Sequence, residues 1–219
     1  MSEFVIRPAT SADIDGLITV HAAAFHDKFL AAFGIRQLGT GLLLMAETWR
    51  RQGSAGLNGM WVVVDGATIV ATIALRARIT MRQLPAVPVE WLFIKKLGFL
   101  RALYALTILS VIDHPVGYDE LYISDVAVHP TYQRRGIARI MLTHALAEAQ
   151  RLNLRSLCLY VSANNHAACA LYQSAGYQPT YTHRSLLAWV ATRRWRWLLM
   201  VRSVQPSPRV GEQPHANNV

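Results

Sequence analysis

Cysteine is scarce in this sequence, and a disulfide-bonded or metal-bound protein is not predicted. The two cysteines, Cys158 and Cys169, lie in apolar segments and are expected to be buried, reduced side chains. The eight histidines form no H-x-x-x-H pair and stand beside no set of cysteines, so no metal site is expected. No cationic stretch followed by an apolar run opens the chain, and a reduced, cytoplasmic location is the expectation.

Acidic residues are also few. The chain has 13 Asp and Glu against 22 Lys and Arg, which gives a formal net charge of +9. A surplus of this kind suits an anionic partner, which can be a nucleic acid, an anionic lipid surface or an anionic cofactor. The chain carries no nucleic-acid-binding motif with fixed spacing, so nucleic acid is not expected.

A long uncharged apolar run is missing too. The most apolar stretch, residues 97–112, contains Arg101 and is too short to span a membrane. It lies in a hydrophobic helical segment, residues 85–117, for which three roles stay open: a helix buried in the core, a lid over a substrate pocket, or a helix on a membrane surface. A core helix is the most common use of such a pattern, and we favour it.

The chain does contain one highly patterned stretch, from Leu121 to Gln178. Residues 121–130 are apolar and β-branched and end in a proline, which predicts a buried strand. A helix should follow after Gly136, because apolar residues then recur at helical spacing at Ile137, Ile140, Met141 and Ala145.

The turn between this strand and this helix predicts an anion site. The first turn of a helix has unpaired N–H groups and the positive end of the helix dipole. Gly136 lets an anion approach the backbone there. Fixed positive charge surrounds the turn at Arg134, Arg135 and Arg139.

The run Gln133-Arg134-Arg135-Gly136-Ile137-Ala138 resembles the Q/R-x-x-G-x-G/A signature of the GCN5-related N-acetyltransferases, the GNAT family. A second strand over 156–161, then Asn165, Tyr172 and Gly176, follow in the order and spacing of that family's second half. The resemblance implies that the turn holds the pyrophosphate of acetyl-coenzyme A (acetyl-CoA). It extends over residues 3–204, and its specific part is residues 121–178.

The resemblance also implies a fold. GNAT proteins are α/β proteins with a mixed, mostly antiparallel central sheet flanked by helices, in which the two central strands splay apart in a V. We therefore expect one GNAT-like domain over residues 1–204, including the helical segment. Residues 205–219 are rich in Pro, Asn, Gln and Gly and are expected to be a disordered tail.

The same resemblance implies the site residues. The backbone of Val126, Ala127 and Val128 would bind the pantetheine arm of acetyl-CoA as an added strand. Asn165 is a helix cap, a cofactor contact or both. Tyr172 stands where the family has the general acid that protonates the departing thiolate, and a packed aromatic is its other possible role. The pyrophosphate would be held by Arg134, Arg135, Gly136, Ile137, Ala138 and Arg139.

The general base is not identified by this pattern. Some members carry a Glu on either central strand, and this chain has Tyr122 and Tyr160 at those positions. Asp125 is nearby, but strict strand alternation puts it opposite Ser124 and favours a structural role. Three residues closer to the N-terminus are interpreted as surface residues: His21, His26 and Asp27.

The sequence thus predicts an enzyme, an N-acetyltransferase that moves an acetyl group from acetyl-CoA directly to an unidentified primary amine of a small molecule, peptide or protein. Two alternatives remain open. One is a degenerate member that binds CoA without turnover, which the missing Glu favours. The other is a peripheral membrane protein that uses residues 89–112. Membrane binding is not favoured, and a homodimer is left open.

Overall fold

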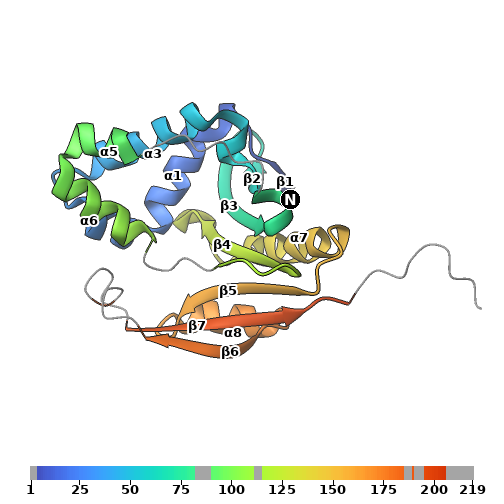
Figure 1. The fold of residues 1–219 in the computed structure, drawn as a ribbon. Coiled ribbons are helices and arrows are strands. Elements are labelled where there is room, and N and C mark those ends of the chain that lie inside the picture. Colours follow the sequence, from blue (N-terminus) through green and yellow to red (C-terminus); the bar gives the residue numbers. More distant parts are fainter. Residues whose placement is uncertain (1–3, 82–89, 111–114, 185–188, 190–194, 206–219) are drawn as a thin grey trace, which may run out of the picture.

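A computed structural model describes residues 4–81, 90–110, 115–184, 189 and 195–205 (Figure 1). Its strands are β1 (Val5–Pro8), β2 (Met60–Asp65), β3 (Thr68–Ala77), β4 (Glu120–Val128), β5 (Ser156–Ser162), β6 (Gln178–Arg184) and β7 (Arg196–Ser203). Its α-helices are α1 (Ile14–Ala24), α2 (His26–Phe33), α3 (Leu38–Gln52), α4 (Arg78–Met81), α5 (Glu90–Leu97), α6 (Phe99–Ser110), α7 (Ile137–Arg151) and α8 (His166–Ser174). The predicted tail, from residue 206 on, lies outside the described residues, as do residues 85–89 and 111–114 of the helical segment.

The strands form one seven-stranded sheet in the order β1-β2-β3-β4-β5-β7-β6. Strands β4 and β5 are parallel, and the other neighbouring pairs are antiparallel. The mixed, mostly antiparallel sheet flanked by helices that the sequence predicted is therefore confirmed.

The two central strands stay paired over only part of their length. Residues 120–123 of β4 pair with residues 156–159 of β5. From Asp125 to Val128, β4 keeps its ladder to β3, but residues 124–128 have no pairing with β5. This is the predicted splay, and it leaves one edge of β4 available as a template for another extended chain.

Helices cover both faces of the sheet. Val62 packs in a cluster with Ile14 and Leu17 of α1, whereas its neighbour Val63 packs in the cluster that contains Met141 and Leu142 of α7. Successive side chains of a strand point to opposite faces, so α1 and α7 lie on opposite sides of the sheet.

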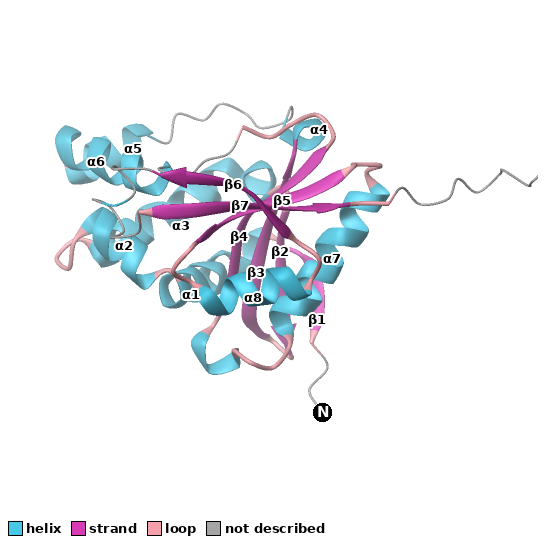
Figure 2. Cartoon of the chain, turned by 90° about the horizontal axis from the view of Figure 1, so that it is seen from below, coloured by secondary structure: helices cyan, strands magenta, loops and turns pink. Residues whose placement is uncertain are grey.

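A third cluster lies at one side of the sheet, where α2, α3, α5 and α6 gather (Figure 2). Within the predicted helical segment 85–117 the described residues form two helices, because Gly98 has φ +80° and ends α5, and the stretch 97–112 is helical as α6 from Phe99 to Ser110. The inner face of α6 is buried against this cluster through Ala102, Ala105 and Ile108, as a core helix would be. Its outer face is exposed.

No single helix within the described ranges is long and apolar enough to cross a membrane. One bent pair, α2 with residues 38–57, passes a test of length and composition, but its two parts meet at 102°.

A close backbone approach at Gly59 gives the first test. Gly59 has φ +78°, its carbonyl accepts a hydrogen bond from the N–H of Leu75 at 2.8 Å, and an added Cβ would collide with the carbonyl oxygen of Leu75. Gly59→Ala should lower the free energy of unfolding by about 2–4 kcal/mol, from the left-handed backbone and the clash together. Gly66→Ala is the matched control, since Gly66 has φ +58° and open space around it, and should cost only about 1–2 kcal/mol. Equal urea-denaturation midpoints for the two variants would contradict the clash.

Candidate functional site

The turn before α7 has the backbone that an anion site needs. Gly136 is the N-terminal cap residue of α7 with φ +81°, and an added Cβ there would meet no atom within 4 Å. Arg134 also has a positive φ, of 63°. Left-handed residues in such a turn favour a concave set of N–H groups, and the space in front of Gly136 is open.

The predicted cations lie in and just after this turn, and the first residue of α7 packs in the core. Arg134, Arg135 and Arg139 are exposed. The Arg139 guanidinium donates to the Ser174 hydroxyl at 3.3 Å, which ties α7 to α8. Ile137 is 1% exposed and fixes the start of α7 in the main cluster, next to half-buried Ala138. The predicted helix is confirmed as α7, and its buried stripe follows Met141, Ala145 and Ala149, whereas Ile140 lies at the edge of the stripe and is 36% exposed.

A pocket of about 410 Å³ lies where β4 and β5 part. Three of the predicted site residues line it together: Val126, Asn165 and Tyr172. Ala127 is buried in the strand, and Val128 and residues 134–139 lie outside the wall of this pocket. The rest of the wall comes from the end of α1 and the start of α2, from β5 and from Ile108 of α6 and Trp197 of β7.

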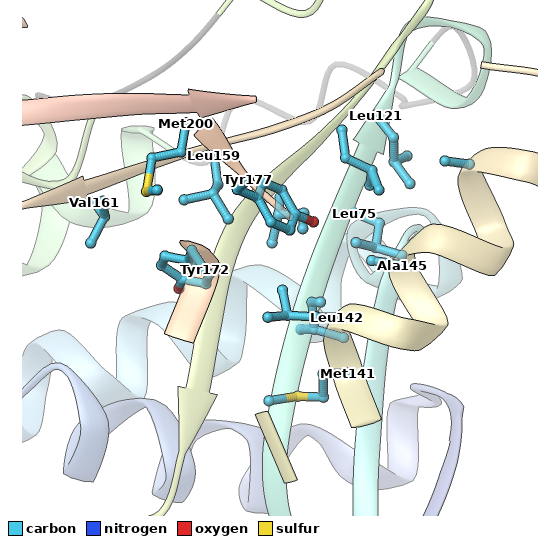
Figure 3. Close-up of a cluster of buried hydrophobic side chains, with 14 of the residues drawn as sticks. Leu75, Leu121, Met141, Leu142, Ala145, Leu159, Val161, Tyr172, Tyr177 and Met200 are labelled. Atoms are coloured by element: carbon cyan, nitrogen blue, oxygen red, sulfur yellow. The ribbon is translucent and has the colours of Figure 1, made fainter. Parts of the chain in front are cut away.

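Tyr172 combines a packed ring with access to the pocket. It is 9% exposed and lies at the margin of the buried cluster in Figure 3, with its ring centre 6.0 Å from that of Tyr177. Burial, followed by the charges of Cys169 and Asp125, raises the pKa of Tyr172 to about 12. The phenol therefore stays protonated at neutral pH and can donate a proton.

Asn165 serves as a helix cap and also faces the pocket. Its side-chain oxygen accepts a hydrogen bond from the N–H of Ala168 at 3.2 Å, which caps α8. It also belongs to the pocket wall. The two roles that the sequence left open are compatible in the structure.

Asp125 lies on the pocket side of β4 together with Ser124, although strict strand alternation predicted opposite faces for the two residues. In the ladder between β3 and β4, Ala74 pairs with Asp125 and Leu75 with Ile123, so Ser124 is an extra residue in a β-bulge. Because the bulge interrupts strict alternation, Ser124 and Asp125 both line the pocket. A bulge leaves no periodic signal in the sequence, and the expectation of a structural role rested on that periodicity.

His21 is not a surface residue, contrary to the prediction. It is 4% exposed, and its Nε2 shares a hydrogen bond of 2.9 Å with the Thr72 hydroxyl. Burial lowers the pKa of His21, while Asp125 opposes this effect and Lys28 adds to it. His26 and Asp27 are exposed, as predicted, yet they line the pocket.

Three polar side chains complete the pocket. Tyr122 and Tyr160, which occupy the positions where the resemblance implied Glu, both line it. Burial raises the pKa of Tyr160, so this phenol stays protonated at neutral pH. Ser162 is 2% exposed, and its hydroxyl has no hydrogen-bond partner among the described residues. An orphaned buried hydroxyl in a pocket wall is a natural contact for a polar ligand atom.

Comparison with known proteins identifies the relatives of this chain. The model of the acetyltransferase (GNAT) family matches residues 41–177, more than half of the chain. The [ribosomal protein bS18]-alanine N-acetyltransferase of Escherichia coli strain K12 is 39% identical over 67 residues, which is 31% of this chain and 45% of that protein. The chain thus matches less than half the length of this curated relative.

Solved structures share the fold. The crystal structure of the ribosomal-protein-S18-alanine N-acetyltransferase from Escherichia coli superposes with a TM-score of 0.56 at 18% identity, covering 96% of this chain and 100% of that one. PaiA N-acetyltransferase from Thermoplasma acidophilum, in complex with coenzyme A, gives a TM-score of 0.58 at 12% identity, covering 92% and 99% of the two chains.

Proposed function

Because the chain belongs to the acetyltransferase (GNAT) family, we propose that it transfers an acetyl group from acetyl-CoA to a primary amine. The observation that carries the proposal is the pocket at the splay, which joins a free edge of β4 to a buried phenol and a carboxylate. The amine is that of a small molecule, a peptide or a protein. The relative from Escherichia coli is a ribosomal-protein-alanine N-acetyltransferase, which makes peptide N-termini the first acceptors to try.

The residues present fit the cofactor. The open space in front of Gly136 and the surrounding arginines suit a pyrophosphate. The edge of β4 from Ser124 to Val128 suits the amides of a pantetheine arm, which would add to the sheet as an extended strand. The orphaned hydroxyl of Ser162 offers one more polar contact. Acetyl-CoA, when bound, supplies an acetyl group activated as a thioester.

Tyr172 supplies the proton that the leaving thiolate needs. An ordinary thiol has a pKa near 8.5, so a positioned phenol can protonate the sulfur directly or through an ordered water. The high pKa of Tyr172 keeps the proton on the phenol until it is needed.

Asp125 receives the acceptor amine. Primary amines are cationic at neutral pH and must lose a proton before they attack a carbonyl. The acids in the pocket wall are Asp27 and Asp125, and Asp125 is the less exposed of the two, so its charge is screened less by solvent. Asp125 attracts the ammonium group and accepts its proton, directly or through water, in place of the Glu that other members carry.

The proposal as a whole is tested by incubating the protein with acetyl-CoA and a panel of amines and peptide N-termini, with detection of the free thiol. Acetylated product identified by mass spectrometry supports it. CoA binding by calorimetry without turnover on any amine in the panel would favour the degenerate CoA-binding protein instead.

Gly136→Val tests the pyrophosphate site. A β-branched side chain would fill the space in front of the turn, and we expect CoA affinity in calorimetry to fall at least about tenfold, or roughly 1.4 kcal/mol. Gly98→Val is the matched control, since Gly98 has nearly the same φ, +80°, and open space but lies between α5 and α6. Unchanged CoA affinity in folded Gly136→Val would reject the site.

Tyr172→Phe tests the general acid. Removal of one hydroxyl should lower kcat by about 10² to 10⁴ and leave CoA affinity unchanged, because the proton is needed only as the thioester breaks. Tyr177→Phe is the control: this phenol is buried beside Tyr172 and its hydroxyl has no partner among the described residues, so its removal should leave kcat unchanged. Single-turnover rates within about threefold of wild type for Tyr172→Phe would exclude it from the mechanism.

Asp125→Asn tests the acceptor carboxylate. For a cationic alkylamine, kcat/KM should fall about 10²-fold or more. For a hydrazide, which is uncharged at neutral pH, the loss in kcat/KM should be much smaller. A purely structural role of Asp125 would lower kcat/KM equally for the alkylamine and the hydrazide. Asp119→Asn, just before β4 and exposed, should behave as wild type with both acceptors. Equal losses with the two acceptors would show that Asp125 only supports the fold.

A further inference from the structure

Helix α6 has its small residues inside and its large apolar residues outside. Ala102 and Ala105 are buried against the third cluster. Phe99, Leu100, Leu103 and Tyr104 are exposed, and their spacing puts them on one stripe of the helix. A helix that served only as a core element would bury the larger side chains, because they gain more from leaving water.

Helix α5 carries one more exposed aromatic side chain, Trp91. Together, five side chains with exposed fractions between 49% and 78% form what we call the α5–α6 patch: Trp91, Phe99, Leu100, Leu103 and Tyr104. Four of the five lie within residues 99–104, and exposed large apolar side chains gathered in this way mark an interaction site. Two of its five members are Trp and Tyr, the residues enriched at membrane–water interfaces.

Positive charge surrounds the patch. Lys95, Lys96 and Arg101 are exposed on the same two helices, where Glu90 is the one acid in their sequence. A small cleft of about 250 Å³ joins Arg101 and Tyr104 to Gly34 and Gln37 in the turn after α2. The two helices therefore combine exposed aromatic and aliphatic groups with three exposed cations, which is the composition of an interfacial membrane-binding surface.

We propose that the α5–α6 patch docks the protein onto an anionic lipid surface. The apolar stripe would enter the headgroup boundary, and the surrounding lysines and arginines would contact anionic headgroups while their stems extend along the apolar surface. A second copy of the chain fits less well, because a two-fold contact through this patch would bring Lys95, Lys96 and Arg101 near their own copies. A nucleic acid fits less well because the centre of the patch is apolar.

Docking would also have a consequence for the candidate site. Helix α6 contributes Ile108 of its buried face to the wall of the large pocket, so a membrane bound on the outer face of α6 would contact a helix that also forms part of that wall. The docking inference does not depend on the proposed acetyl transfer, since it rests on a different face of α6.

The test is cosedimentation of the full chain with vesicles of phosphatidylcholine alone and vesicles in which phosphatidylglycerol replaces part of it, at low and physiological salt. We expect binding to the mixed vesicles, weaker binding at the higher salt, and little binding to phosphatidylcholine alone. The double variant Leu100→Ser/Leu103→Ser and the double variant Lys95→Ala/Lys96→Ala should each bind the mixed vesicles at least about tenfold more weakly.

Controls remove an exposed aromatic and an exposed cation elsewhere. Tyr181→Ser on the edge strand β6 and Arg155→Ala should bind as wild type does. Acetyl transfer to a soluble amine should be unchanged in Leu100→Ser/Leu103→Ser, so a failure of docking can be told from a failure of the proposed function. Equal binding by wild type and both double variants would overturn the proposal. So would absent vesicle binding together with a dimer, in sedimentation velocity, that Leu100→Ser/Leu103→Ser abolishes.

Discussion

The parting of β4 from β5 after Ile123 is the constraint on which the rest of the site depends. A strand in the middle of a sheet normally satisfies its backbone groups on both sides. Here β4 keeps one ladder, to β3, and the other edge is free from Ser124 onward. The same divergence opens the pocket, so the free backbone edge and the cavity have a single cause.

The main cluster holds this arrangement open. Ile137 and Met141 of α7 pack on one side, and Tyr172 and Tyr177 fill the space near β5. Because these side chains are closely packed, neither α7 nor α8, which carries Tyr172, can move into the gap between β4 and β5 without breaking core contacts. This gap places the buried phenol of Tyr172 and the half-buried carboxylate of Asp125 in the wall of the same pocket.

Burial gives the polar groups of the site distinct roles. The phenol of Tyr172 has its pKa raised to about 12, whereas the pKa of His21, deeper in the protein, is lowered. Burial in both cases favours the neutral form. The neutral form is thereby favoured both for Tyr172 in the pocket wall and for His21 outside it, and Asp125 is the partly buried carboxylate of that wall.

The sequence by itself determined the local elements of the second half of the chain. The strand before Gly136, the helix after it and the cap at Asn165 follow from residue types at short spacing, and these interactions form within a few residues of one another. What only the tertiary structure decided is which face of each element is covered and by what. The bulge at Ser124, the burial of His21 and the outward apolar stripe of α6 each depend on partners distant in sequence, and no local pattern records such partners.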